Sequence, residues 1–176
     1  SINNTNYYNY NFKNNFSKNN SSFELDFEFD KKLKIDFINY EKEEDKIAKI
    51  FLKVNTKKDK IDIKKLQYKE NKNLIEMEEI EIYKKNLTSL KKITVKTFEK
   101  KDLKNDFTLD FGKKITISGN KYDAKNLNKY LNQKAKNNTL KKISKEIHID
   151  LKNIDTPLSK KLMNFRLLGV IEKGKF

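Results

Sequence analysis

The sequence predicts a mainly β protein: a long antiparallel sheet of short strands, with one or two short helices near residues 123–145. Three observations lead to this prediction. Residues 23–30 read F-E-L-D-F-E-F-D, in which apolar and acidic residues alternate without exception. Similar alternation recurs up to about residue 118, and the spacing of apolar residues changes after Gly119. Because successive side chains of a strand point to opposite faces, each such segment has one apolar and one polar face.

Charge and hydropathy taken alone favour a less ordered chain. Charged residues make up 37% of the sequence, whereas about 25% is usual in soluble domains, and the mean hydropathy is −0.91. The regular sorting of apolar residues onto one face argues for a folded sheet instead. A net charge of +15 permits binding to nucleic acid or to an anionic membrane surface, although a solvated lysine face also accounts for it.

The first two parts of the chain follow from the same alternation. Residues 1–22 form either an asparagine-rich polar segment or a first strand, in which Tyr8, Tyr10 and Phe12 alternate with polar residues. Residues 23–118 follow as an antiparallel β meander, because polar breaks such as E-K-E-E-D and K-K-D-K separate its apolar rows. The βαβ alternation of a parallel sheet is missing, so we do not expect a nucleotide-binding α/β fold.

Residues 119–176 allow two interpretations. In the first, Asp123 caps a short helix, and the strands after it continue the sheet. In the second, T-L-K-K-I-S-K-E-I-H-I-D and the segment after it form a winged helix-turn-helix. Lys160, Lys161 and Arg166 would then lie on the recognition helix and bind DNA in its major groove.

The sequence offers no set of residues for catalysis, metal binding or cofactor binding. Cysteine is absent, which excludes disulfides, thiolate metal sites and a cysteine nucleophile. The one histidine, His148, is flanked by isoleucines, and the four glycines form no phosphate-binding motif. We therefore expect a protein that is not an enzyme, with no catalytic residue, no metal site and no cofactor.

The two ends of the sequence favour a piece of a longer protein. The chain starts with Ser1 rather than Met, and its last residues, G-K-F, break off inside a strand-like pattern. No apolar run is long enough to span a bilayer, and no signal peptide is present. For an internal fragment, the absence of such segments says little about location.

Two runs in the second half resemble a known family. They read D-F-G-K-K-I-T-I-S-G-N-K-Y-D-A-K-N-L-N-K-Y-L and I-D-T-P-L-S-K-K-L-M-N-F-R-L-L-G-V-I-E-K-G-K-F. Both resemble the middle region of AsmA-like envelope proteins of the YhdP type, by motif over residues 107–176 and by alternation alone over residues 8–100. The resemblance implies a section of a periplasmic protein whose parent is anchored in the inner membrane. It also implies a twisted, taco-like β-sheet that transports phospholipid to the outer membrane, with components of both membranes as partners.

Alternation and resemblance together predict an open apolar groove that shields the acyl chains of phospholipid. Its lining is the set of apolar residues from the strand-like rows: Phe23, Leu25, Phe27, Phe29, Leu33, Ile35, Phe37, Ile50, Leu52, Val54, Ile93, Val95, Phe107, Leu109, Ile115 and Ile117. A structural β-sandwich needs the same one-sided strands, so that alternative stays open. DNA binding by a winged helix in a cytoplasmic protein is the other alternative.

Overall fold

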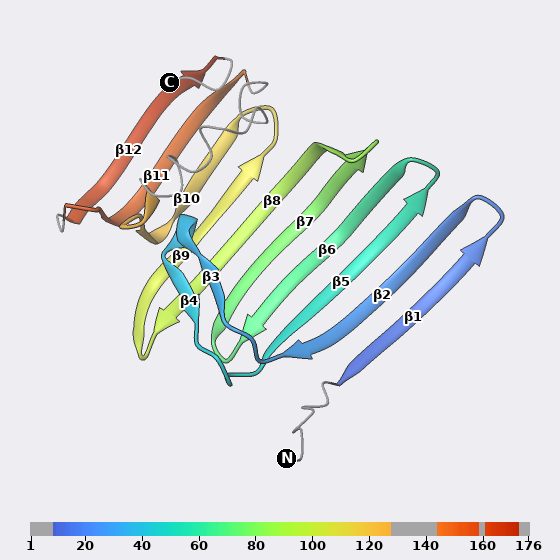
Figure 1. The fold of residues 1–176 in the computed structure, drawn as a ribbon. Coiled ribbons are helices and arrows are strands. Elements are labelled where there is room, and N and C mark those ends of the chain that lie inside the picture. Colours follow the sequence, from blue (N-terminus) through green and yellow to red (C-terminus); the bar gives the residue numbers. More distant parts are fainter. Residues whose placement is uncertain (1–8, 128–143, 159–160, 173–176) are drawn as a thin grey trace.

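A computed structural model describes residues 9–127, 144–158 and 161–172 of the chain. These residues form an open sheet of ten strands in the order β1-β2-β5-β6-β7-β8-β9-β10-β11-β12, together with a hairpin of β3 and β4 (Figure 1). The strands are β1 (Tyr10–Ser17), β2 (Asn20–Phe29), β3 (Leu33–Ile35), β4 (Tyr40–Lys42), β5 (Ala48–Lys57), β6 (Lys60–Glu70), β7 (Asn73–Tyr83), β8 (Asn86–Glu99), β9 (Asp102–Phe111), β10 (Ile115–Asp123), β11 (Lys145–Asp155) and β12 (Lys161–Ile171). The predicted fold class is confirmed: the protein is mainly β and its sheet is not closed into a barrel.

The order of the strands follows the sequence, because most neighbours are joined by short turns. From β5 to β10 each strand pairs antiparallel with the next one along the chain. The first seven residues of F-E-L-D-F-E-F-D lie in β2, which pairs with β1 on one side and with β5 on the other. The first strand that the tyrosine and phenylalanine alternation suggested is therefore β1, at one edge of the sheet.

One pairing departs from the predicted antiparallel meander. Strand β11 runs parallel to β10, with Ile149 opposite Ile117. Parallel neighbours need a crossover connection of a dozen or more residues, and the segment between β10 and β11 is long enough for one. The short helices predicted near residues 123–145 fall mostly on residues 128–143, which lie outside the described residues. Just before them, the Lys125 N–H donates to Asp123 Oδ1 at 3.2 Å, as it would at a helix N-cap.

The segment that the winged-helix alternative required is a pair of strands. Strands β11 and β12 are antiparallel to each other, and Lys161 and Arg166 belong to β12. The helix-turn-helix interpretation is therefore wrong for the described residues; Lys160 lies outside them. The alternation in I-H-I-D-L decides the outcome, because it places three apolar side chains on the same face as the neighbouring strands' apolar residues.

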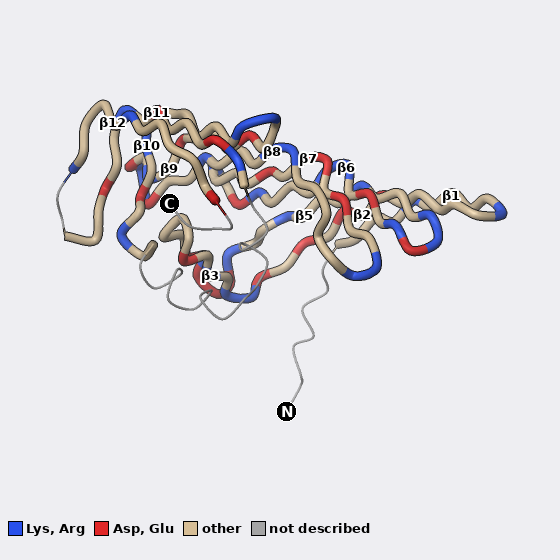
Figure 2. The backbone as a smooth tube through the Cα atoms, turned by 90° about the horizontal axis from the view of Figure 1, so that it is seen from above, with Lys and Arg blue, Asp and Glu red and all other residues tan. Residues whose placement is uncertain are grey.

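The segment between β2 and β5 leaves the sheet and folds over one of its faces. It consists of β3, a 3-10 turn (Asp36–Ile38) and β4, and Figure 2 shows it on one side of the sheet. Asn39, with a φ of 47°, reverses the chain at the tip of this hairpin. The predicted lining of the apolar groove includes Leu33, Ile35 and Phe37. As a correction, they belong to the hairpin and pack against the sheet from outside it.

The opposite face of the sheet is charged, and its ion pairs match the strand register. Glu24 of β2 lies 2.7 Å from Lys53 of β5, and Glu28 lies 2.8 Å from Lys49. Each lysine, by its hydrogen bond, lowers the pKa of its glutamate partner. Like charges directly across a strand pair are destabilising, so these two pairs favour the observed register of β2 and β5. Between β5 and β6 the charges do not alternate in this way, since Lys53 faces Lys65.

Candidate functional site: the apolar face of the sheet

The site that the sequence suggests is the apolar face of the sheet. The strands are in register, so that one apolar residue from each of the ten described sheet strands falls in a single row across it. We call this the central row. In order from β1 to β12 it consists of Phe12, Leu25, Leu52, Leu66, Met77, Ile93, Leu109, Ile117, Ile149 and Leu167.

The apolar face is continuous because the alternation of apolar and charged residues is interrupted at the same level in three neighbouring strands. Residues 63–66 read I-K-K-L, residues 77–80 M-E-E-I and residues 90–93 L-K-K-I, so two charged residues separate two apolar ones in each. These insertions lie at the same level of the sheet, where Lys64 of β6 and Glu79 of β7 form an ion pair of 2.8 Å. The extra charged residue in each strand shifts the alternation by one position. The apolar residues before and after it therefore lie on the same face, although they are three positions apart.

Part of this face is not covered by any other described residue. We call it the open half and define it by apolar residues of β1, β2 and β5–β8 that belong to neither buried core cluster. Those that are at least partly exposed are Phe12, Phe16, Phe23, Leu25, Phe27, Leu52, Ile61, Ile63, Leu66, Met77, Ile82, Leu87 and Leu90; Val54 and Ile80 lie among them and are buried. Phe16 is 81% exposed, Phe12 52%, Leu87 51% and Ile61 38%. Large apolar side chains at such exposure are typical of interaction surfaces and ligand-binding grooves.

The rest of the face carries the protein's main buried core. We call it the covered half. Under the hairpin, Ile38 and Tyr40 pack with buried sheet residues that include Ala48, Val95 and Leu151. A second, smaller cluster of Leu109, Ile115 and Ile147 continues it toward β12. Here the chain itself supplies the apolar partner that the open half lacks among the described residues.

A buried hydrogen-bond network fixes the hairpin to the covered half. The Asn105 side chain donates to the Ile38 carbonyl and to Thr97 Oγ1, both at 2.8 Å, and it accepts from the Asp123 N–H at 2.9 Å. At the hairpin tip, Asn39 donates to Asp123 Oδ2 at 2.9 Å. Buried polar groups are costly when unpaired, so this network specifies where the hairpin sits.

A second polar cluster lies below β4. The Tyr40 and Tyr68 hydroxyls are 2.7 Å apart, and Tyr40 also donates to the buried Glu70 carboxylate at 3.1 Å. Asn73 donates to the same carboxylate and accepts from the Phe98 N–H. Burial raises the pKa of both tyrosines, that of Tyr68 to about 12. The arrangement holds a hairpin strand on the sheet and offers no nucleophile or substrate cleft.

The predicted lining residues fall on both halves. All of them except the three hairpin residues lie on the apolar face of the sheet, with Phe23, Leu25 and Leu52 in the open half. Val54 is buried between its neighbours. The prediction missed five members of the central row: Phe12, Leu66, Met77, Ile149 and Leu167. Each stands in an apolar alternation, and the shared insertion in β6–β8 was the missing signal for Leu66 and Met77.

Other chemistry is not suggested by the described residues. His148 lies on the charged face of β11, where its Nδ1 is 3.1 Å from Lys114 Nζ. Among the described residues no group of three or more His, Asp or Glu side chains could hold a metal ion. The same part of the chain contains no helix that is long and apolar enough to cross a membrane.

Comparison with known proteins assigns no family. No protein-family description, no curated protein and no solved structure matches this chain at significant similarity. The two-sided sheet and its open half are therefore the observations from which a function can be inferred.

Proposed function

We propose that the open half binds the acyl chains of phospholipid and shields them from water. The chain would act as a section of a bridge-like lipid-transfer protein of the cell envelope, in a periplasmic parent anchored in the inner membrane. The central row carries this proposal, because it offers an unbroken apolar path across the described strands, with exposed Phe12 at one end.

The dimensions of the open half suit an acyl chain. Neighbouring strands lie about 4.8 Å apart, so β1, β2, β5, β6 and β7 span roughly 19 Å along the central row. The hydrocarbon core of a bilayer is about 30 Å thick, which gives one leaflet's chain a length of about 15 Å. One acyl chain can therefore lie along the row and stay within the open half.

The energetics also favour a lipid occupant. Full burial of an acyl chain contributes about 0.8 kcal/mol per methylene, so contact along four or five strands supports reversible binding of one chain. The reverse face, with its paired lysines and carboxylates, stays in water. A sheet that is apolar on one side and charged on the other suits a path that separates lipid from solvent.

The β-sandwich alternative requires a second layer across the apolar face. Among the described residues that layer is the β3–β4 hairpin, and it covers only one half. An apolar ligand on the open half would complete the burial that the hairpin provides elsewhere.

The test is phospholipid binding by the full chain and by two triple variants with the same change of charge. Phe12→Asp, Ile61→Asp and Leu87→Asp place three carboxylates on exposed positions of the open half. Asn15→Asp, Asn20→Asp and Asn86→Asp place three on exposed positions of the charged face that face no carboxylate across the strand pair. We expect mass spectrometry to find phospholipid copurifying with the native chain and the second variant, and to find at least a tenfold loss in the first.

Circular dichroism checks that both triple variants keep the β-sheet. Equal phospholipid in both folded variants, or none with the native chain after exposure to phospholipid vesicles, would contradict the proposal.

A further inference from the structure

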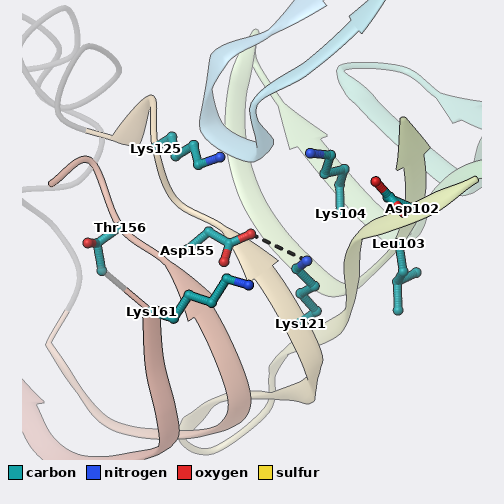
Figure 3. A pocket seen from close by; sticks show the side chains of 8 residues that line it. All are labelled: Asp102, Leu103, Lys104, Lys121, Lys125, Asp155, Thr156 and Lys161. Carbon is teal, nitrogen blue, oxygen red and sulfur yellow. Dashed lines mark ion pairs between the residues drawn. The ribbon is translucent and has the colours of Figure 1, made fainter. Parts of the chain in front are cut away.

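The parallel pairing of β10 and β11 creates a second feature, away from the open half. Because these strands run in the same direction, both end at the same edge of the sheet, where β9 and β12 begin. A pocket of about 610 Å³ lies there, lined by the start of β9, the end of β10 and its following turn, the end of β11 and the start of β12 (Figure 3). Its volume is in the range of small-molecule sites.

Four lysines line this pocket, each from a different segment. Lys104 comes from β9, Lys121 from β10, Lys125 from the turn after β10 and Lys161 from β12. In Figure 3 the ammonium ends of all four point toward the middle of the pocket. Four like charges repel one another, so their convergence needs compensation by negative charge.

Two of the four lysines form ion pairs with carboxylates. Asp155, which is buried, lies 3.4 Å from Lys121, and Lys104 is held at 2.7 Å by the exposed Glu99 outside the pocket. Asp102 also lines the pocket. Asp123 is a fourth carboxylate, close enough to Lys104 to act on it electrostatically, so that the carboxylates balance the four lysines overall. No ion pair to another described residue is found for Lys125 or Lys161.

The position of Lys125 is fixed by the turn that carries it. The Lys125 N–H donates to Asp123 Oδ1 at 3.2 Å, and the Ala124 N–H donates to the Asp155 carbonyl at 2.9 Å. Asp123 is itself held by Asn39 of the hairpin and by Asn105 of β9. The backbone of the cationic site is thus ordered before any ligand arrives, which lowers the cost of binding.

We propose that this pocket is a binding site for a phosphate ester. The negatively charged oxygens of a phosphate ester can accept hydrogen bonds from Lys125 and Lys161, the two pocket lysines for which no ion pair to another described residue is found. A soluble phosphate ester and a phospholipid headgroup share this chemistry. The site stands on residues separate from the open half, so it does not depend on the proposed acyl-chain binding.

The experiment compares two double variants of the full chain that remove the same charge. Lys125→Gln with Lys161→Gln changes the pocket, and Lys57→Gln with Lys113→Gln changes exposed lysines elsewhere. Glycerol 3-phosphate is titrated by calorimetry, and sedimentation measures binding to phosphatidylcholine vesicles with and without phosphatidylglycerol.

We expect the pocket variant to bind at least one of these probes tenfold more weakly than the native chain, with no change in the control variant. Loss of glycerol 3-phosphate binding assigns the site to soluble phosphate esters. Loss confined to vesicles that contain phosphatidylglycerol assigns it to a lipid headgroup. Equal binding by the two double variants for both probes would overturn the site. The Phe12, Ile61 and Leu87 triple variant should keep glycerol 3-phosphate binding, which separates failure of this site from failure of the acyl-chain proposal.

Discussion

The covered and open halves of the apolar face are built from the same kind of strand and differ in what lies on them. In the covered half, the hairpin buries Val95 to 2% exposure and Phe107 to 4%, whereas Phe12 in the open half is 52% exposed. The two halves share continuous rows of paired residues, such as Phe27, Ile50, Tyr68 and Ile75. One-sided alternation thus fixes which face is apolar, and a separate segment decides whether that face becomes a core or a surface.

The largest difference between the halves should appear when the same charge is introduced into each. Val95→Asp buries a carboxylate beneath the hairpin and should lower the free energy of unfolding by about 4 kcal/mol or more. Phe12→Asp, at an exposed edge position, should lower it by about 1 kcal/mol. Urea denaturation measures both. Similar losses for the two variants would mean that the open half is as much a core as the covered half.

A smaller effect should follow when the hairpin loses its anchor. Asn105→Leu removes the hydrogen bonds to Ile38 and Thr97 and leaves the Asp123 N–H unpaired, which should cost about 1–3 kcal/mol. Binding of a hydrophobic dye should increase, because the covered half then resembles the open half. Asn120→Leu changes an exposed asparagine of β10 and serves as control. Unchanged dye binding in Asn105→Leu would show that the hairpin is held by apolar packing alone.

Alkaline pH should lower the free energy of unfolding through two buried tyrosines of the covered half. Burial raises the pKa of Tyr40 and Tyr68, so the folded protein keeps protons that the unfolded chain releases above about pH 10. Their contribution to stability is complete below that pH and declines as pH rises toward 12, the pKa of Tyr68. The free energy of unfolding should therefore fall more steeply between pH 9 and 12 in the native chain than in the Tyr40→Phe, Tyr68→Phe variant. A Tyr10→Phe, Tyr83→Phe variant, which changes exposed tyrosines, should keep the native slope.

The smallest effect is expected on the charged face that both halves share. Glu24→Lys puts a like charge opposite Lys53 in β5 and Lys13 in β1 and should lower stability only slightly, because the Glu24–Lys53 pair is exposed to water. Adding Lys53→Glu restores the pair with its signs exchanged and should recover most of the loss. The coupling between the two sites, measured as a double-mutant cycle, should shrink at high salt. A coupling energy that does not change with salt concentration would contradict the expectation that this pair favours the register by electrostatic attraction alone.

Much of the fold could be predicted because alternation is a local property of the sequence. F-E-L-D-F-E-F-D fixed the two faces of β2, and similar rows fixed most of the later strands. The hairpin could not be predicted in the same way: L-K-I-D-F alternates like a sheet strand, and the hydrogen bonds that hold it on the sheet, from Asn105 to the Ile38 carbonyl and from Asn39 to Asp123, come from residues distant in the sequence. The parallel pair β10–β11 and the lysine pocket beside it depend on that long-range pairing too, which no local spacing specifies.

The central claim is that the open half, and not the covered half, is a surface for lipid. A benzophenone side chain placed at Phe23 in the open half, at Phe107 under the hairpin, and at Glu24 on the charged face compares the three environments in the full chain. After irradiation with phospholipid vesicles, we predict lipid adducts at Phe23, none at Glu24, and crosslinks within the chain at Phe107. Adducts at none of the three positions, or equally at Phe23 and Glu24, would contradict the claim.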